Sequence, residues 1–256
     1  ALTGLDLVEW QLRVAQGEVL PQTNQQTILQ RFEAGGHAIE ARLCAEDPAL
    51  DFLPQSGRLL AWQPGDAVRV DHALVCGADI APYYDSMVAK FIAHGSDRDA
   101  ARHALAHALV DAVVLGVPTN QAYLAACVEH PVFAAGQAST AFIAVHGQQL
   151  LDTLPALQPA EAALLLYAAR ALRDDHDPTD VRLPLAWPLP MRLAIDGQMA
   201  QVDVSALGGN RYQVQAGAER QTLVLLSCVA GHTTMACNGS RRHMAWAWDA
   251  DGQLHA

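Results

Sequence analysis

The chain has 256 residues, of which 51% are hydrophobic and 17% are charged, and its formal net charge is -11. This length and hydrophobic content predict one or two globular domains and argue against global disorder. An acidic chain without a cluster of Lys and Arg residues is not expected to bind the phosphates of a nucleic acid.

The cysteines and the apolar segments bear on the compartment. The five cysteines are scattered and form no C-x-x-C pair, which favours reduced thiols in a cytoplasmic compartment. No apolar run reaches the roughly 18–20 residues that span a bilayer, and no stretch has the basic start and apolar core of a signal peptide. The first residues contain no initiator Met and resemble the middle of a larger domain. We therefore interpret the chain as an internal fragment of a longer protein.

The N-terminal part of the sequence is predicted to contain a helix, a connector and then strands. Apolar residues at helical spacing predict a helix over 3–15, with Thr3 as its cap and Gly17 at its end. Residues 18–34 are polar and rich in Gln, which is typical of a connector. The segments that follow are expected to form three strands and then one helix: 37–43, 58–62, 67–71 and 86–93.

Two further helices are predicted in the middle of the chain. The first covers 97–114, with Ser96 as its cap and Gly116 and Pro118 at its end. The second begins at Thr119-Asn120 and runs to about residue 130. This order of strands first and helices afterwards predicts an α+β unit up to about residue 146.

The second half of the sequence has a different pattern. Residues 147–158 resemble a linker, and the helix predicted over 161–173 carries Ala and Leu on all its faces, so it should be buried on all of them. The simplest architecture is an antiparallel barrel or curled sheet around this helix. Met244, Trp246 and Trp248 are expected to share one strand face. Turn signals separate the predicted strands: 191–195, 200–204, 211–216, 222–229, 232–238 and 242–249.

Three motifs carry a resemblance to a known family. In chain order they are GHAIEARLCAEDP at 36–48, FLPQSGRL at 52–59 and PYYDSMVAK at 82–90. In this order and at this spacing they resemble the C-terminal subdomain of biotin carboxylase, the ATP-dependent part of biotin-dependent carboxylases. A chance match to all three motifs is very rare.

The layout of the second half is similar to another part of such enzymes. The biotin-carrying subunits of methylcrotonyl-CoA and propionyl-CoA carboxylases have a mediating (BT) domain, in which an antiparallel β-barrel encloses a long helix and docks onto the carboxyltransferase subunit. The sequences DFLP at 51–54 and SGRL at 56–59 are more similar to the methylcrotonyl and geranyl types. The expected domains are the end of an ATP-grasp region with a connector (1–34), the biotin carboxylase C-terminal subdomain (35–146), a linker (147–158) and the BT-type docking domain (159–256).

The resemblance assigns a chemical role to Arg42. The ureido oxygen of biotin gains negative charge when N1′ loses its proton, and a fixed guanidinium stabilises that charge. In the family this group belongs to the Arg of the His-Ala-x-Glu-x-Arg strand; on the residues alone, a single strand Arg is more often structural. Asp85 either orients this Arg through a charge-assisted pair or caps a helix before Ser86. Glu40 is a supporting residue of the same motif, and Glu46-Asp47-Pro48 favours a turn.

Other candidates have weaker support. Arg69 matches a surface that biotin carboxylases use for self-association, and the sequence is shortened beside it at 64–66. Phe142 matches a position near the adenine of ATP, although a place in the core also explains an apolar residue there. His103 and His107 have a spacing that can bind zinc, but no third ligand is evident, so a helix surface is favoured and no metal site is predicted.

The resemblance covers the middle of a parent subunit. The sequence shows no Gly-rich nucleotide loop, no carboxylate set for Mg²⁺ and no biotin-acceptor motif. We interpret the chain as part of the biotin-bearing subunit of an acyl-CoA carboxylase, a ligase of the methylcrotonyl-CoA type, inactive as a fragment. Biotin would be covalently bound on a domain outside the chain, and ATP, Mg²⁺ and bicarbonate mainly by residues outside it. The expected partners are the biotin carrier domain and the carboxyltransferase subunit, without nucleic acid or membrane.

Two alternatives stay open at this point. In the first, the parent enzyme is a propionyl-CoA or geranyl-CoA carboxylase. This sequence does not separate these types, because the carboxyltransferase subunit selects the acyl-CoA. In the second, the protein is a structural assembly module whose working part is residues 160–256. Replacement of Arg42 separates an enzyme from an assembly module, because only the enzyme loses biotin carboxylation while assembly is kept.

Overall fold

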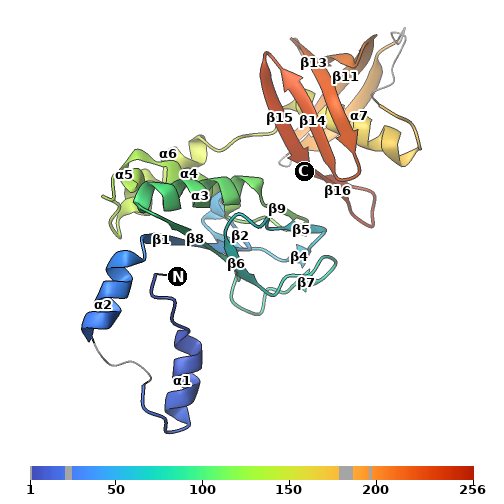
Figure 1. Cartoon of the computed structure of the whole chain (residues 1–256). Helices are drawn as coiled ribbons and strands as arrows, with labels where there is room; N and C mark the ends of the chain where they lie inside the picture. Colours follow the sequence, from blue (N-terminus) through green and yellow to red (C-terminus); the bar gives the residue numbers. More distant parts are fainter. Residues whose placement is uncertain (1, 21–24, 179–186, 196–197) are drawn as a thin grey trace. The chain divides into compact units, whose positions relative to one another are not determined.

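The computed structural model describes residues 2–20, 25–178, 187–195 and 198–256 (Figure 1). The chain divides into two compact units, unit 1 (Ala1–Leu154) and unit 2 (Pro155–Ala256). Both units combine helices with antiparallel strands, so the mixed helix and sheet class expected from the sequence is confirmed. Among the described residues, no helix combines the length and the hydropathy that crossing a membrane requires.

Two helices precede the first strand. Helix α1 (Leu7–Ala15) begins at Asp6, whose carboxylate accepts hydrogen bonds from the next turn. Thr3 is therefore not the cap, because a cap must lie directly before the first helical residue. The expected connector over 18–34 is also wrong in part, since helix α2 (Gln25–Ala34) occupies its second half. Seven of the ten residues of α2 are Gln, Leu, Arg, Glu or Ala, all of them good helix formers.

A three-stranded antiparallel sheet forms the centre of unit 1. Its order is β1 (His37–Cys44), β8 (Met87–Gly95) and β6 (Arg69–His72), so that β8 is the middle strand. The helix expected over 86–93 is thus wrong. Ala89, Phe91 and Ala93 are buried in alternation with more exposed residues, and this period of two belongs to a strand.

Helix α3 (Arg98–Asp111) covers one face of this sheet (Figure 1). Leu105 and Leu109 of the helix pack in one core with Leu43 and Phe91 of the strands. The helix is shorter than expected at both ends. Asp97 caps it, where the sequence indicated Ser96, and residues Val113–Leu115 form strand β9 in place of a last turn.

We expect the Asp97 cap to give unit 1 a pH-dependent part of its stability. The Asp97 carboxylate accepts a hydrogen bond from the Ala100 N–H, and this bond lowers the pKa of Asp97. A lowered pKa stabilises the fold above the pKa of the unfolded state, and the gain is lost as the pH falls through the folded pKa. Asp97→Ala should therefore lower the urea midpoint of unfolding at pH 7, and its effect should shrink as the pH falls through the folded pKa. Ser96→Ala removes a second hydrogen bond to the same carboxylate, at 3.1 Å, and should lower the midpoint at pH 7 by less than Asp97→Ala does.

Short strands and three helices complete unit 1. Three pairs of short antiparallel strands join β2 with β3, β4 with β7 and β5 with β9. Helix α6 runs on to Asp152, so residues 147–152, which the sequence placed in a linker, are helical. The bounds of these elements are β2 (Glu46–Asp47), η1 (Pro48–Leu50), β3 (Leu53–Pro54), β4 (Gly57–Arg58), β5 (Ala61–Gln63), β7 (Asp79–Ile80), α4 (Gln121–Glu129), α5 (Pro131–Ala134) and α6 (Phe142–Asp152).

Unit 2 is a curled antiparallel sheet with one helix packed against it. Helix α7 (Pro159–Arg173) confirms the helix predicted over 161–173. Its Leu164 and Leu165 share a core with Val202, Tyr212 and other residues of the strands. Six strands follow one another as neighbours in the sheet, each paired with the next: β10 (Leu189–Ile195), β11 (Gln198–Gly208), β12 (Arg211–Ala216), β13 (Glu219–Val229), β14 (His232–Cys237) and β15 (Ser240–Ala245).

The edges of this sheet favour the curled sheet over the barrel, the two arrangements that the sequence left open. Over the described residues, β10 and β15 lie at the two edges and do not pair with each other. The expected strand over 242–249 is broken at Trp246, whose indole N–H donates to the Thr233 hydroxyl at 3.0 Å in the core. Two short strands, β16 (Ala247–Trp248) and β17 (Leu254–His255), pair after the break.

Candidate functional site

Arg42 lies near the end of β1, on the face of the sheet that α3 does not cover. Its neighbours Ala41 and Leu43 are buried in the core, so the alternation of a strand directs Arg42 outward. Gly36, which opens the motif, has a φ of +75°, and a Cβ there would meet the Gly95 carbonyl oxygen at 2.2 Å. Only glycine fits at this start of the strand.

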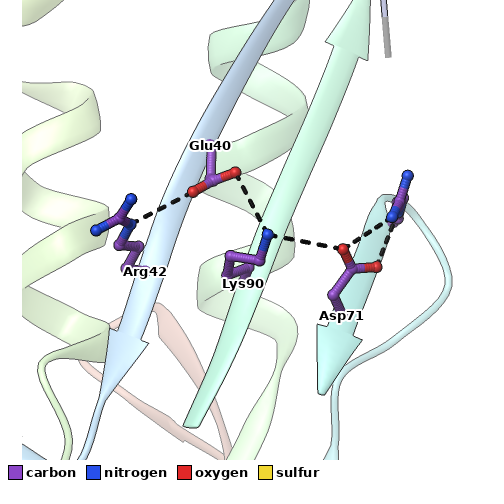
Figure 2. A network of polar contacts seen from close by, with 5 residues as sticks. Glu40, Arg42, Asp71 and Lys90 are labelled. Atoms are coloured by element: carbon purple, nitrogen blue, oxygen red, sulfur yellow. Dashed lines mark hydrogen bonds and ion pairs between the residues drawn. The ribbon is translucent and has the colours of Figure 1, made fainter. Parts of the chain in front are cut away.

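A ladder of alternating charges crosses the same face of the sheet (Figure 2). Arg42 Nε lies 3.5 Å from Glu40 Oε1, and Lys90 Nζ lies 3.9 Å from both Glu40 Oε2 and Asp71 Oδ2. At the far end, Arg69 Nε and Nη2 donate to the two oxygens of Asp71 at 2.8 and 2.9 Å. We call these five residues, on β1, β8 and β6, the charge ladder.

The strand register explains the order of charges in the ladder. Arg42 and Asp71 are both paired with Lys90, from opposite sides of β8. Two cations directly opposite each other destabilise a sheet, and Glu40 lies between Arg42 and Lys90 to offset this repulsion. The alternation of charges therefore fixes where the cations of the ladder lie. Exposed ion pairs of this kind add little stability, typically about 0–1 kcal/mol each.

The pKa values in the ladder shift at its Arg69 end. Hydrogen bonds from Arg69 lower the pKa of Asp71, and the charges of Arg69 and Lys90 act in the same direction. The pKa of Arg69 is raised by the same hydrogen bonds. Asp71 is therefore ionised at neutral pH, and the ladder keeps its alternation of charge there.

Few contacts restrain the side chain of Arg42. The side chain is 71% exposed, and its one hydrogen bond within the described part of the chain is the contact with Glu40. Its two terminal nitrogens make no hydrogen bond with any described residue. The guanidinium thus presents its fork of donors to the open face of the sheet.

Asp85 lies in the turn just before β8. Its Oδ1 accepts a hydrogen bond from the Met87 N–H at 2.8 Å and closes a turn into a strand. The interpretation as a helix cap is wrong, because no helix follows. No ion pair joins Asp85 to Arg42 in the described part of the chain, and the pairing of the two stays a prediction. Both act on the Cys44 thiol, whose pKa is raised mainly by burial and by Glu46.

The segment after Arg42 is a tight turn, as the Glu46-Asp47-Pro48 sequence predicts. The Asp47 carboxylate accepts from the Ala49 N–H at 2.9 Å and caps η1. The Ser86 hydroxyl donates to Glu46, which fixes the turn to the beginning of β8. Both carboxylates thus take part in the local structure of this turn.

Asn120, which the sequence analysis used only as the start of a helix, contacts the strand of Arg42. Its Oδ1 accepts from the Cys44 N–H at 2.9 Å, and its Nδ2 donates to the Arg42 carbonyl oxygen at 3.3 Å. Its own backbone N–H donates to the Cys44 carbonyl oxygen at 3.1 Å. No sequence signal joins positions so far apart, and only the fold brings them together.

Phe142, the first residue of α6, is buried among aromatic rings. Its ring centroid lies 5.2 Å from that of His130 and 5.3 Å from that of His146. It belongs to a small core with Tyr123 and Leu150. The core explanation of this residue therefore has direct support, and the role near an adenine stays a prediction.

The two histidines with a zinc-like spacing lie on a helix surface. His103 and His107 are exposed on α3, and His103 contacts Arg102. Among the described residues, no group of three or more His, Cys, Asp or Glu side chains is placed to hold a metal ion.

Comparisons with known proteins agree with the motifs around Arg42. Residues 40–145 match the family model of the biotin carboxylase C-terminal domain. The alpha subunit of mitochondrial methylcrotonoyl-CoA carboxylase from Dictyostelium discoideum is 36% identical over 185 residues, which cover 69% of this chain and 26% of that protein. A biotin carboxylase from Halalkalibacterium halodurans is 42% identical over 147 residues, which cover 57% and 31%.

A solved structure shares the fold of the same region. It is the biotin carboxylase domain of Hydrogenobacter thermophilus 2-oxoglutarate carboxylase, in complex with MgADP, ADP and bicarbonate. The TM-score is 0.54 at 34% identity, and the match covers 58% of this chain and 32% of that one. The chain therefore spans between about a quarter and a third of the length of these relatives.

Proposed function

Residues 40–145 are a biotin carboxylase C-terminal domain, and on this premise we propose that the chain is part of the biotin-bearing subunit of an acyl-CoA carboxylase. Such a subunit is a ligase that carboxylates biotin at the expense of ATP. Identity with methylcrotonoyl-CoA carboxylase alpha subunits from Dictyostelium discoideum, rat and rice favours the methylcrotonyl-CoA type.

The observation that carries the proposal is the open presentation of Arg42. Carboxylation requires N1′ of biotin to lose a proton, which places negative charge on the ureido oxygen. A guanidinium is a permanent cation, and the terminal nitrogens of Arg42, which bond no described residue, can donate two hydrogen bonds that converge on that oxygen. Donors that are fixed where charge develops stabilise the transition state more than the ground state. Carboxylation of biotin with labelled bicarbonate, measured with and without Arg42, tests this role.

The rest of the charge ladder supports Arg42. Glu40 contacts Arg42 and Lys90 together, so it restricts the guanidinium without blocking its terminal nitrogens. Asp85, in the turn just before the neighbouring strand β8, is proposed as a second orienting carboxylate when the substrate is bound. Arg69, at the far end of the ladder, is proposed to contact a second copy of the subunit.

The sites of ATP, Mg²⁺ and bicarbonate are proposed to lie mainly in the part of the subunit that this chain does not span. The solved biotin carboxylase domain that binds MgADP and bicarbonate is about three times longer than the region matched here. Phe142, which belongs to the small core with Tyr123 and Leu150, is proposed to lie beside the adenine of ATP. On this basis the 256-residue chain alone is expected to show no bicarbonate-dependent hydrolysis of ATP.

Unit 2 is proposed to be the BT domain that docks the subunit onto its carboxyltransferase partner. The alignment with the Dictyostelium discoideum subunit spans 185 residues, which is longer than unit 1 and therefore extends into unit 2. A helix that shares its core with a curled antiparallel sheet is the arrangement that the resemblance implies.

Docking through unit 2 predicts a specific assembly result. When the chain is mixed with the carboxyltransferase subunit from the same source, light scattering should detect a stable complex. A chain truncated after Leu154 should remain unbound, because it lacks the docking domain. A monodisperse full chain that forms no complex would contradict the assignment of unit 2, and equal binding by the truncated chain would place the docking surface in unit 1.

A further inference from the structure

Asn120 does not behave as the start of a helix usually does. An Asn directly before a helix normally accepts hydrogen bonds from the first turn through its side chain. Asn120 precedes α4 and makes no such bond. It is only 7% exposed, and both ends of its amide contact β1, at Arg42 and Cys44. The side chain thus does not cap its own helix. It forms hydrogen bonds with a strand that is distant in the sequence instead.

The bonds of Asn120 replace those of a missing neighbour strand. β1 is an edge strand, paired with β8 on one side only. On its other side the Arg42 carbonyl oxygen and the Cys44 N–H and carbonyl oxygen are all bonded by Asn120. This is also the point at which the register of β1 against β8 shifts, between Leu43 and Cys44. Asn120 therefore fixes the backbone where the regular ladder of hydrogen bonds is interrupted.

Asn120 is itself held on a rigid support. The next residue, Gln121, donates from Nε2 to the carbonyl oxygens of Leu109 and Ala112 at 2.6 and 2.7 Å, and so joins the start of α4 to the end of α3. One turn later, Tyr123 packs edge to face on Phe52, with ring centroids 5.2 Å apart. The amide of Asn120 thus has little freedom to follow β1 if that strand shifts.

We propose that Asn120 is a positioning residue for Arg42, an inference that rests on the proposed function. The Arg42 side chain has one hydrogen bond to a described residue, so its direction follows from the backbone at Arg42 more than from side-chain contacts. Loss of the amide leaves the Arg42 carbonyl oxygen and the Cys44 N–H without their partners and frees this end of the strand. A displacement of about 1 Å at a catalytic group can lower a rate by up to roughly a hundred-fold.

The test is Asn120→Ala in the full-length subunit, with two activities measured on the same sample. One is the carboxylation of free biotin, and the other is bicarbonate-dependent cleavage of ATP without biotin. Only the first depends on Arg42. We expect the first to fall by about ten- to a hundred-fold and the second to change by less than about two-fold. A purely structural role would lower both activities together, and that outcome would overturn the inference.

Two further variants sharpen the result. Thr153→Ala removes a part-buried hydrogen bond from the Thr153 hydroxyl to the Leu150 carbonyl oxygen, away from Asn120 and β1, so it should leave the ratio of the two activities unchanged. Asn120→Asp keeps the shape of the side chain, and its carboxyl can donate to the Arg42 carbonyl oxygen only when protonated. The ratio should therefore be low at neutral pH and rise as the pH falls. An unchanged ratio in both Asn120 variants would contradict the positioning role of Asn120.

Arg42→Ala, measured alongside, separates failure of the inference from failure of the proposed function. If Arg42→Ala lowers the ratio and Asn120→Ala does not, Arg42 acts on biotin without help from Asn120, and only the inference is wrong. If Arg42→Ala leaves the ratio unchanged, the proposed function is wrong, and the inference falls with it.

Discussion

Replacing Arg42 by Ala in the full-length subunit is expected to lower the carboxylation of biotin by about 10²–10³-fold, the loss that follows removal of a donor aimed at a developing oxyanion. The structure gives this Arg an exposed guanidinium with both terminal nitrogens free of described partners. Its side chain is 71% exposed and makes one ion pair, at 3.5 Å, with a described residue, so the fold should tolerate the change. The measurement is transfer of labelled bicarbonate to free biotin.

Two matched variants control this prediction. Arg58→Ala removes another exposed strand Arg of unit 1, outside the charge ladder, and should leave the carboxylation rate unchanged. Arg42→Lys keeps the positive charge but loses the planar fork of donors, so we expect an activity between those of the native residue and Ala. Light scattering with the carboxyltransferase subunit should show intact assembly in all three variants. Full activity of Arg42→Ala would exclude a role of this residue on biotin.

The alternation around Arg42 could be predicted from the sequence, because it is a local property of one strand. Ala41 and Leu43 are apolar and Glu40 and Arg42 are charged, so a period of two already directs Arg42 to the polar face. The same reasoning failed over 86–93. Val88 and Ile92 lie four residues apart as on a helix face, yet both belong to β8, where the buried residues are Ala89, Phe91 and Ala93. Middle strands with apolar residues on both faces lose the alternation that identifies them.

Contacts between distant segments could not be predicted at all. The charge ladder depends on the register of three strands, and the sequence carries no record of which residues face each other across them. Asn120 was visible only as a residue that favours the start of a helix. Its actual partners on β1 lie 76 and 78 residues earlier. The preference of Asn for helix starts therefore placed Asn120 correctly before α4 but did not predict its hydrogen bonds to β1.

Leu164→Ala is expected to be strongly destabilising in unit 2, with a loss of about 2–5 kcal/mol in the free energy of unfolding. Leu164 lies on α7, is 0% exposed and belongs to the core that this helix shares with the curled sheet. A cavity at this point removes contacts from helix and strands together, and neighbours in a packed core relax only partly. The measurement is urea unfolding of the 256-residue chain, with hydrogen exchange to report on the amides of each unit separately.

The matched control is Leu226→Ala, because the same atoms are removed from a side chain that is 41% exposed on β13. A surface change of this kind is expected to alter the free energy of unfolding by no more than about 0.5 kcal/mol. A large loss confined to the amides of unit 2 for Leu164→Ala, with little change for Leu226→Ala, would mean that the helix stabilises the sheet from within its core. Equal effects of the two variants would mean that α7 contributes no more than a surface helix does, and the likeness of unit 2 to a helix enclosed by strands would then lose its physical basis.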